Sequence, residues 1–212
     1  MKSVTDMPPT LPVFPLTGVL LLPRGYLPLN IFEPRYLMMV DDALKSDRLI
    51  GMIQPRMSDD GGKGPLFETG CAGKITSFLE TGDGRYEITL TGICRFRTAK
   101  EVSNGTPYRR MQADWARFDK DFTPGDCLDI DRPLLKQMLK DYFAKHDLSC
   151  DWDAIDGAPD GRLITCLSMI CPFDPGEKQA LLEADCCRDR ARKFMSLLEM
   201  AIQGGECGSG CH

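Results

Sequence analysis

Short apolar runs separated by glycine and proline make up the first half of the chain. These runs predict β-strands over residues 11–14, 19–22, 27–32, 49–54, 70–79 and 108–118. Apolar and polar residues alternate from Tyr86 to Thr91, which is typical of an antiparallel strand with one buried face. This strand continues past Gly92, where we expect a β-bulge. Since Pro12 and Pro15 cannot donate a backbone hydrogen bond, the first run is predicted to be an edge strand or an extended segment.

One helix is predicted within this strand-rich half. Pro34 suits its first turn, because the N–H that proline lacks has no partner there. Leu37, Val40 and Leu44 follow at helical spacing and define an apolar face. The first half of the chain therefore predicts a small, curled antiparallel sheet or barrel that carries one helix.

The apolar period becomes 3.6 residues from Asp131 onward. It predicts helices over residues 131–145 and 163–170, and a third, long helix that begins at the N-cap Asp174 and ends at Gln203. The sequence thus predicts an α+β fold in which a helical bundle follows the sheet. We expect a β-rich part over residues 1–118, a helical part over 119–205 and a flexible tail over 206–212.

The charge of the chain is low and unevenly distributed. The formal net charge is −5, with +2 over residues 1–113 and −6 over residues 114–160. Nucleic-acid-binding proteins normally carry a concentrated basic patch, so this distribution disfavours nucleic acid as a partner. Arg95 and Arg97, like Arg109 and Arg110, are interpreted as part of solvated strand faces.

Ten cysteines raise the question of disulfides and metal sites. No Cys-x-x-Cys motif occurs, and the cluster Cys207, Cys211 and His212 offers three ligands where a structural zinc site needs four. We therefore predict no metal and no cofactor, and expect the remaining cysteines to pack as small apolar residues. No stretch of 18 apolar residues and no secretory signal is seen, so a cytoplasmic location is expected.

Catalytic motifs are missing from the sequence. The glycine-rich segment 61–64 lacks the spacing of a phosphate-binding loop. The single internal histidine, His146, follows a predicted helix end, where a cationic residue is favourable, and no Gly-x-Ser-x-Gly motif accompanies it. These observations favour binding over catalysis.

Several segments resemble the N-terminal substrate-binding domain of Lon proteases, and they occur in the same order as in that domain. They span residues 11–16, 23–25, 27–29, 31–36, 73–75, 83–85, 90–96 and 178–183, together with Arg190. The resemblance covers roughly residues 10–203 and implies a PUA-like pseudobarrel followed by a helical bundle. Lon proteases continue into an ATPase module and a Ser-Lys peptidase domain. This chain stops before either one, so we expect a free-standing, non-catalytic domain and no enzyme.

The resemblance also implies a function. It points to binding of unfolded or extended polypeptide in protein quality control, with a protease or ATPase as the expected partner. The polypeptide is expected to bind by strand addition at an open sheet edge or in the crevice between barrel and bundle. The predicted peptide-binding residues are Leu22, Tyr26, Leu27, Phe32, Glu33, Arg35 and Tyr36. Glu33, Arg35 and Tyr36 have a second interpretation, in which a buried ion pair and a stacked ring fix the helix to the barrel. Met38 and Met39 are expected either in the core or on an adaptable surface.

Two further functions remain open at this point. PUA-like folds often bind RNA, so RNA is the alternative ligand, although the charge balance counts against it. A cryptic hydrolase or small-molecule sensor is the third hypothesis, and the missing acid–base residues disfavour it. A basic strip with aromatic residues favours RNA, an apolar groove favours polypeptide, and a closed polar pocket favours a small molecule.

Overall fold

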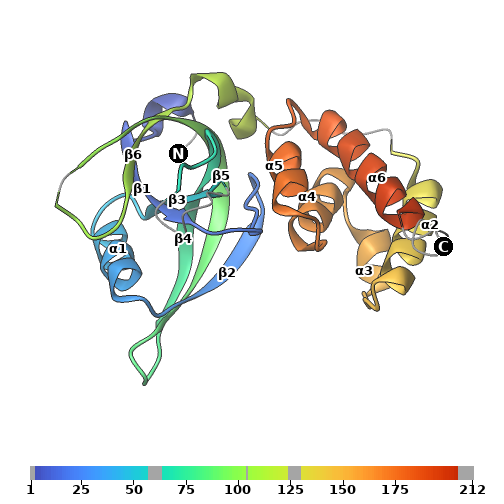
Figure 1. Cartoon of the computed structure of the whole chain (residues 1–212), viewed down its shortest axis with the longest axis horizontal. Helices are drawn as coiled ribbons and strands as arrows, with labels where there is room; N and C mark the ends of the chain where they lie inside the picture. The colour runs from blue at the N-terminus through green and yellow to red at the C-terminus, as the bar shows by residue number, and fades with distance from the viewer. Residues whose placement is uncertain (1–2, 57–63, 104, 124–129, 205–212) are drawn as a thin grey trace, which may run out of the picture.

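The computed structural model describes residues 3–56, 64–103, 105–123 and 130–204. These residues form a β-barrel from the first half of the chain and a helical unit from the second (Figure 1). The barrel part consists of η1 (Val4–Asp6), β1 (Thr10–Pro15), β2 (Tyr26–Ile31), α1 (Pro34–Leu44), β3 (Leu49–Ile53), β4 (Thr69–Glu80), β5 (Tyr86–Glu101), β6 (Arg110–Asp114) and η2 (Ala116–Phe122). The helical unit consists of α2 (Arg132–Lys145), α3 (Trp152–Gly157), α4 (Asp160–Ile170), α5 (Pro175–Leu182) and α6 (Cys187–Gln203). The predicted α+β class is confirmed.

The long strand β5 closes the barrel. The strand order is β2-β5-β4-β3-β1-β6, and β6 also pairs with β5. The first part of β5 pairs with β2 and its last part pairs with β6, so this one strand joins the two ends of the sheet. Opposite β4, Gly92 pairs with Gly73 and Cys94 pairs with Ala72, which leaves Ile93 as an extra residue. The predicted bulge is therefore present.

The interior of the barrel is filled around the fully buried ring of Phe96. Gly51 and Gly70 face this ring, and a Cβ atom on either glycine would lie 2.8 or 2.6 Å from its Cζ atom. Only glycine allows the two strands to approach the ring this closely.

Several predictions about the β-rich part are wrong. β1 is not an edge strand, since it pairs with β6 through Thr10–Pro12 and with β3 from Val13 onward. Its pairing with β3 is parallel, so the sheet is not purely antiparallel as predicted. The Val13 N–H donates to the β6 side, at Arg109 O, and the Leu16 N–H donates to the β3 side, at Ile53 O. By alternation, the missing N–H groups of Pro12 and Pro15 point to places where no strand is paired.

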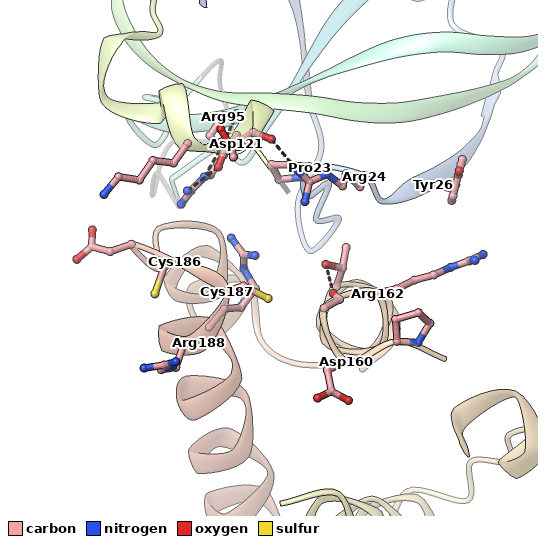
Figure 2. Close-up of a pocket in the computed structure, with 17 residues that line it drawn as sticks. Pro23, Arg24, Tyr26, Arg95, Asp121, Asp160, Arg162, Cys186, Cys187 and Arg188 are labelled. Atoms are coloured by element: carbon pink, nitrogen blue, oxygen red, sulfur yellow. Dashed lines mark hydrogen bonds and ion pairs between the residues drawn. The ribbon is translucent and has the colours of Figure 1, made fainter. Parts of the chain in front are cut away.

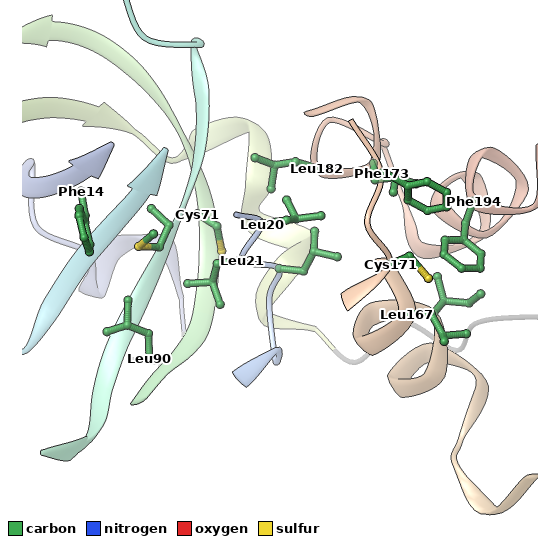
Figure 3. Close-up of a cluster of buried hydrophobic side chains, with 14 of the residues drawn as sticks. Phe14, Leu20, Leu21, Cys71, Leu90, Leu167, Cys171, Phe173, Leu182 and Phe194 are labelled. Carbon is green, nitrogen blue, oxygen red and sulfur yellow. The ribbon is translucent and has the colours of Figure 1, made fainter. Parts of the chain in front are cut away.

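The strand predicted over residues 19–22 is also wrong. These residues form an irregular segment in which Leu20, Leu21 and Leu22 are all buried. In Figure 3, Leu20 and Leu21 lie between the sheet and the helices. Burial on every side, rather than strand pairing, explains the continuous apolar run. The strand predicted over 108–118 is also shorter than expected, because it ends at Asp114 and η2 follows.

In the helical unit, the helix predicted over residues 131–145 is confirmed as α2, and His146 follows it as the C-cap residue. The capping box of Asp174 and Glu177 is present at the start of α5. The long third helix is wrong, because α5 ends at Leu182 and α6 begins at Cys187. The short helix α3, with Asp151 as its N-cap, was not predicted.

The barrel and the helical unit share a hydrophobic core. One cluster of buried side chains runs from Phe14 and Leu90 in the barrel to Leu167 and Phe194 in the helices (Figure 3). Buried polar groups also cross the junction: Lys178 Nζ donates to Gly18 O at 2.9 Å. Burial lowers the pKa of the Lys178 ammonium group. The two parts are thus held together by packing and by hydrogen bonds.

The boundary predicted near residue 118 falls inside η2, whose Phe118 packs in a core cluster of the barrel. The tail over 206–212, including Cys207, Cys211 and His212, lies outside the described residues. Within the described ranges, no helix combines the length and apolar character needed to cross a membrane. The expectation that the cysteines pack inside is wrong for Cys186, which is exposed.

Candidate functional site: a crevice between barrel and helices

An open crevice of about 1010 Å³ lies between the barrel and the helical unit (Figure 2). Four segments that are distant in sequence line it. They are the turn before β2 and its first residue (Pro23, Arg24, Tyr26), β5 with η2 and its C-terminal residue (Arg95, Lys120, Asp121, Thr123), the start of α4 (Pro159, Asp160, Gly161, Arg162, Thr165) and the connection from α5 into α6 (Asp185, Cys186, Cys187, Arg188, Arg190).

The buried ion pair of Arg95 and Asp121 organises the crevice. Arg95 Nη2 lies 2.8 Å from Asp121 Oδ1, Arg95 Nε donates to Asp121 Oδ2 at 3.0 Å, and the two side chains are only 5% and 8% exposed. Burial acts to lower the pKa of Arg95, but the hydrogen bonds and charge of Asp121 outweigh it and the pKa is raised. The guanidinium therefore remains charged inside the protein.

Arg95 also joins the barrel to the helical unit. Its Nη1 donates to Leu182 O at 3.0 Å and to Ala184 O at 2.5 Å, at the C-terminus of α5. Arg190 Nε donates to Leu181 O at 2.9 Å. Two guanidinium groups thus satisfy carbonyls at the end of α5 that a continuing helix would have bonded internally. This explains why the chain breaks between α5 and α6.

Arg95 was expected on a solvated strand face, and this prediction is wrong. The outer face of β5 is covered here by the α5–α6 connection, so Arg95 is only 4% exposed as a residue. Arg97, two residues later, follows the expectation: its side chain is half-exposed and pairs with Glu68. The difference depends on which tertiary neighbour covers the strand, and single-sequence periodicity does not contain that information.

The walls of the crevice carry exposed side chains. Arg24 extends from the barrel, with its Nη2 donating to Asp121 O at 3.2 Å. Tyr26 is 59% exposed at the beginning of β2. Figure 2 places Arg24 and Tyr26 on the barrel side, Arg162 on α4 below them, and Arg188 on α6 at the other side of the view.

Of the predicted peptide-binding residues, Tyr26 alone lines this crevice. Leu22 is fully buried and Leu27 is half-buried, so the prediction that Leu22 is exposed is wrong. Leu22 is held inward because its carbonyl contacts the backbone around Gly92, where a Cβ atom would lie 2.0 Å from Leu22 O. It packs in the shared core.

The remaining predicted residues lie together at the start of α1, away from the crevice. Glu33 and Arg35 form an ion pair of 2.7 Å, but both side chains are more than 40% exposed. The Arg35 guanidinium lies over the Tyr36 ring at 4.5 Å, and this ring is buried against Phe14. The stacked ring agrees with the interpretation in which this motif fixes the helix to the barrel, but the expected burial of the ion pair is wrong. Burial raises the pKa of Tyr36.

Next to that motif, an exposed apolar group lies on the β4–β5 hairpin. Phe32 is 62% exposed and Phe78 is 40% exposed, and the Phe78 ring contacts the Tyr86 ring at a centroid distance of 5.0 Å. Met38 is exposed while Met39 is fully buried. This hairpin surface is a second place where apolar side chains meet solvent.

The crevice residues that the sequence analysis missed are arginines. Arg162 and Arg188 were assigned no role, since each is an ordinary polar residue on a helix. Their only sequence signal is a position just before a predicted helix, for Arg162, or in the interior of one, for Arg188, and both positions are common for arginine. Within the described ranges, no three His, Cys, Asp or Glu side chains are placed to hold a metal ion.

The architecture and the crevice describe a barrel-plus-helix binding domain. A family model described as the ATP-dependent protease La (LON) substrate-binding domain matches residues 10–200. The chain therefore belongs to this family of Lon substrate-binding domains.

Relatives and solved structures agree with this assignment. Lon protease 2 of Myxococcus xanthus is 30% identical over 198 residues, which cover 91% of this chain and 24% of that protein. Lon protease of Roseiflexus castenholzii is also 30% identical, with 92% and 24% covered. The chain thus spans about a quarter of the length of the curated relatives it matches, and only their substrate-binding domain is matched.

Two solved structures of Lon N-terminal domains share the fold. The Lon N-terminal domain protein from Xanthomonas campestris has a TM-score of 0.59 at 22% identity and covers 88% of this chain and 97% of that one. The N-terminal domain of Mycobacterium avium complex Lon protease has a TM-score of 0.62 at 16% identity, with 90% and 98% covered. At these identities the likeness extends to the fold alone.

Proposed function

We propose that this chain is a non-catalytic module that binds unfolded or extended polypeptide in protein quality control. The observation that carries the proposal is the open crevice of about 1010 Å³, whose walls come from two structural parts held in fixed positions by Arg95. Clefts at the junction of two folded parts are common binding sites. Membership in a family described as substrate-binding supports polypeptide as the ligand.

Strand addition at β2 is the other route considered for the same ligand. In the described part of the chain, β2 pairs on one side only, with β5. Pro28 lies in the middle of β2 and has no N–H group to donate, so an added strand could not form a continuous set of hydrogen bonds with this edge. We therefore place the polypeptide in the crevice. The proposal includes a cytoplasmic location and a protease or ATPase partner, both of which stay predictions.

RNA is less well supported than polypeptide. Proteins that bind single-stranded RNA stack its bases on several aromatic side chains. Among the described residues that line the crevice, Tyr26 is the only aromatic one, so several stacked bases would find no further ring there. A short RNA is accordingly the control ligand.

The test is fluorescence anisotropy with a labelled, permanently unfolded polypeptide, and a folded protein with the same label as control. We expect saturable binding to the unfolded chain alone. Tyr26→Ala should weaken this binding several-fold, because it removes an exposed ring of the crevice that contributes little to the core. Phe78→Ala is the matched variant, since it removes an exposed ring on the hairpin outside the crevice.

The pair of variants separates the two surfaces. Loss of binding in Phe78→Ala with normal binding in Tyr26→Ala would move the site to the hairpin. Absence of binding by the unmodified protein at tens of micromolar would overturn the proposal.

A further inference from the structure

Among the described residues that line the crevice, cationic side chains outnumber acidic ones. Six cationic side chains face three acidic ones in this part of the chain, although the chain as a whole has a formal charge of −5. A local excess of one sign inside a cleft attracts ligands of the opposite sign. The sign of the excess is the first indication of what the crevice takes.

The three aspartates are already engaged with other groups. Asp121 pairs with the buried Arg95, and Asp160 accepts from Arg132 Nε at 2.6 Å. Asp185 lies 3.4 Å from Arg117, which is not part of the lining. These carboxylates therefore do not neutralise the exposed cations of the crevice.

The exposed cations, in contrast, have no acidic partner in the described ranges. Lys120, Arg162 and Arg188 form no ion pair there, and Arg24 contacts a carbonyl rather than a carboxylate. They come from both walls of the crevice (Figure 2). Guanidinium groups on facing walls suit carboxylates that are spaced along an extended chain.

We infer that the crevice selects polypeptide segments that carry aspartate or glutamate side chains. This inference rests on the proposed function and specifies its ligand. The charge contacts are exposed, so each contributes modestly and is screened by salt. Together they should bias the crevice toward acidic segments, while Tyr26 and the apolar stems of the arginines contact the rest of the chain.

The experiment compares two labelled 15-residue peptides that differ only in the replacement of every Asp and Glu by Asn and Gln. At low salt the acidic peptide should bind about tenfold more tightly than the neutral peptide. At 0.5 M salt the preference should fall to about twofold or threefold, since the screening length is then only a few ångströms.

Two double variants locate the preference. Arg162→Gln with Arg188→Gln should abolish it, whereas Arg85→Gln with Arg192→Gln, which removes the same charge from exposed positions outside the crevice, should retain it. Alkylation of Cys186, which is exposed at the crevice, should slow when the acidic peptide is bound, as mapped by mass spectrometry.

The outcomes separate the two proposals. Equal binding of both peptides would overturn the acidic preference and leave polypeptide binding in place. Absence of binding by either peptide would overturn both. Tighter binding of a single-stranded RNA of similar length, lost in the crevice variant, would show that the arginines serve nucleic acid and would overturn the inference.

Discussion

Replacing Arg95 by methionine should destabilise the protein severely, because the side chain is buried and makes hydrogen bonds to both parts of the molecule. The substitution keeps much of the apolar stem but removes the guanidinium. Asp121 is then left as a buried carboxylate without its cation, and such a loss typically costs about 3–5 kcal/mol. Leu182 O and Ala184 O also lose their donor, at about 1 kcal/mol each.

These effects are coupled, so a total of about 4 kcal/mol is expected rather than their sum. That is a large part of the 5–15 kcal/mol by which a domain is usually stable. Urea unfolding followed by circular dichroism measures the change in the free energy of unfolding. Arg97→Met is the control, because Arg97 lies on the same strand but its ion pair with Glu68 is half-exposed.

We expect Arg97→Met to unfold close to the unmodified protein. The double variant Arg95→Met with Asp121→Leu should recover part of the loss, since no charge is then left buried alone. The reasoning is refuted if Arg95→Met is no less stable than Arg97→Met, or if the double variant is less stable than Arg95→Met.

Two further predictions concern packing and pH. Gly92→Ala should cost about 3 kcal/mol or prevent folding, because its Cβ would lie 2.0 Å from Leu22 O, whereas Gly82→Ala, with no atom within 4 Å, should shift the melting temperature little. Burial raises the pKa of the Cys171 thiol from 9.0 to about 12, so its contribution to stability is complete below pH 9 and is lost as the pH rises toward 12. Under reducing conditions, unfolding between pH 8 and 11 should therefore show a decline that is shallower in Cys171→Ala by up to about 1.4 kcal/mol per pH unit, and parallel declines would contradict this assignment.

The sequence predicted the elements whose determinants are local. The bulge beside Gly92, the helix α2 and the capping box of Asp174 all follow from residues within a few positions of each other. The short motifs that resemble Lon substrate-binding domains also predicted the family correctly. These features depend on backbone propensity and on spacing, which one sequence contains.

The wrong predictions share a different cause. The break between α5 and α6 is stabilised by Arg95, which is 87 residues away from the carbonyl of Leu182 in the sequence. The segment 19–22 is apolar because two parts of the molecule close over it, and periodicity does not distinguish this from a strand. The crevice likewise combines four distant segments. Such features follow from tertiary contacts alone.

The arginines of the crevice illustrate how tertiary context divides one residue type into two roles. Arg95 and Arg190 are buried and donate to carbonyls of α5, so they determine where the helices lie. Arg162 and Arg188 are exposed and have no acidic partner in the described ranges, so their charge remains available to a ligand. Substitution of the first pair should lower stability before binding can be measured, whereas substitution of the second should change binding while the melting temperature stays the same. A site whose walls and floor respond so differently allows ligand recognition to be measured separately from folding.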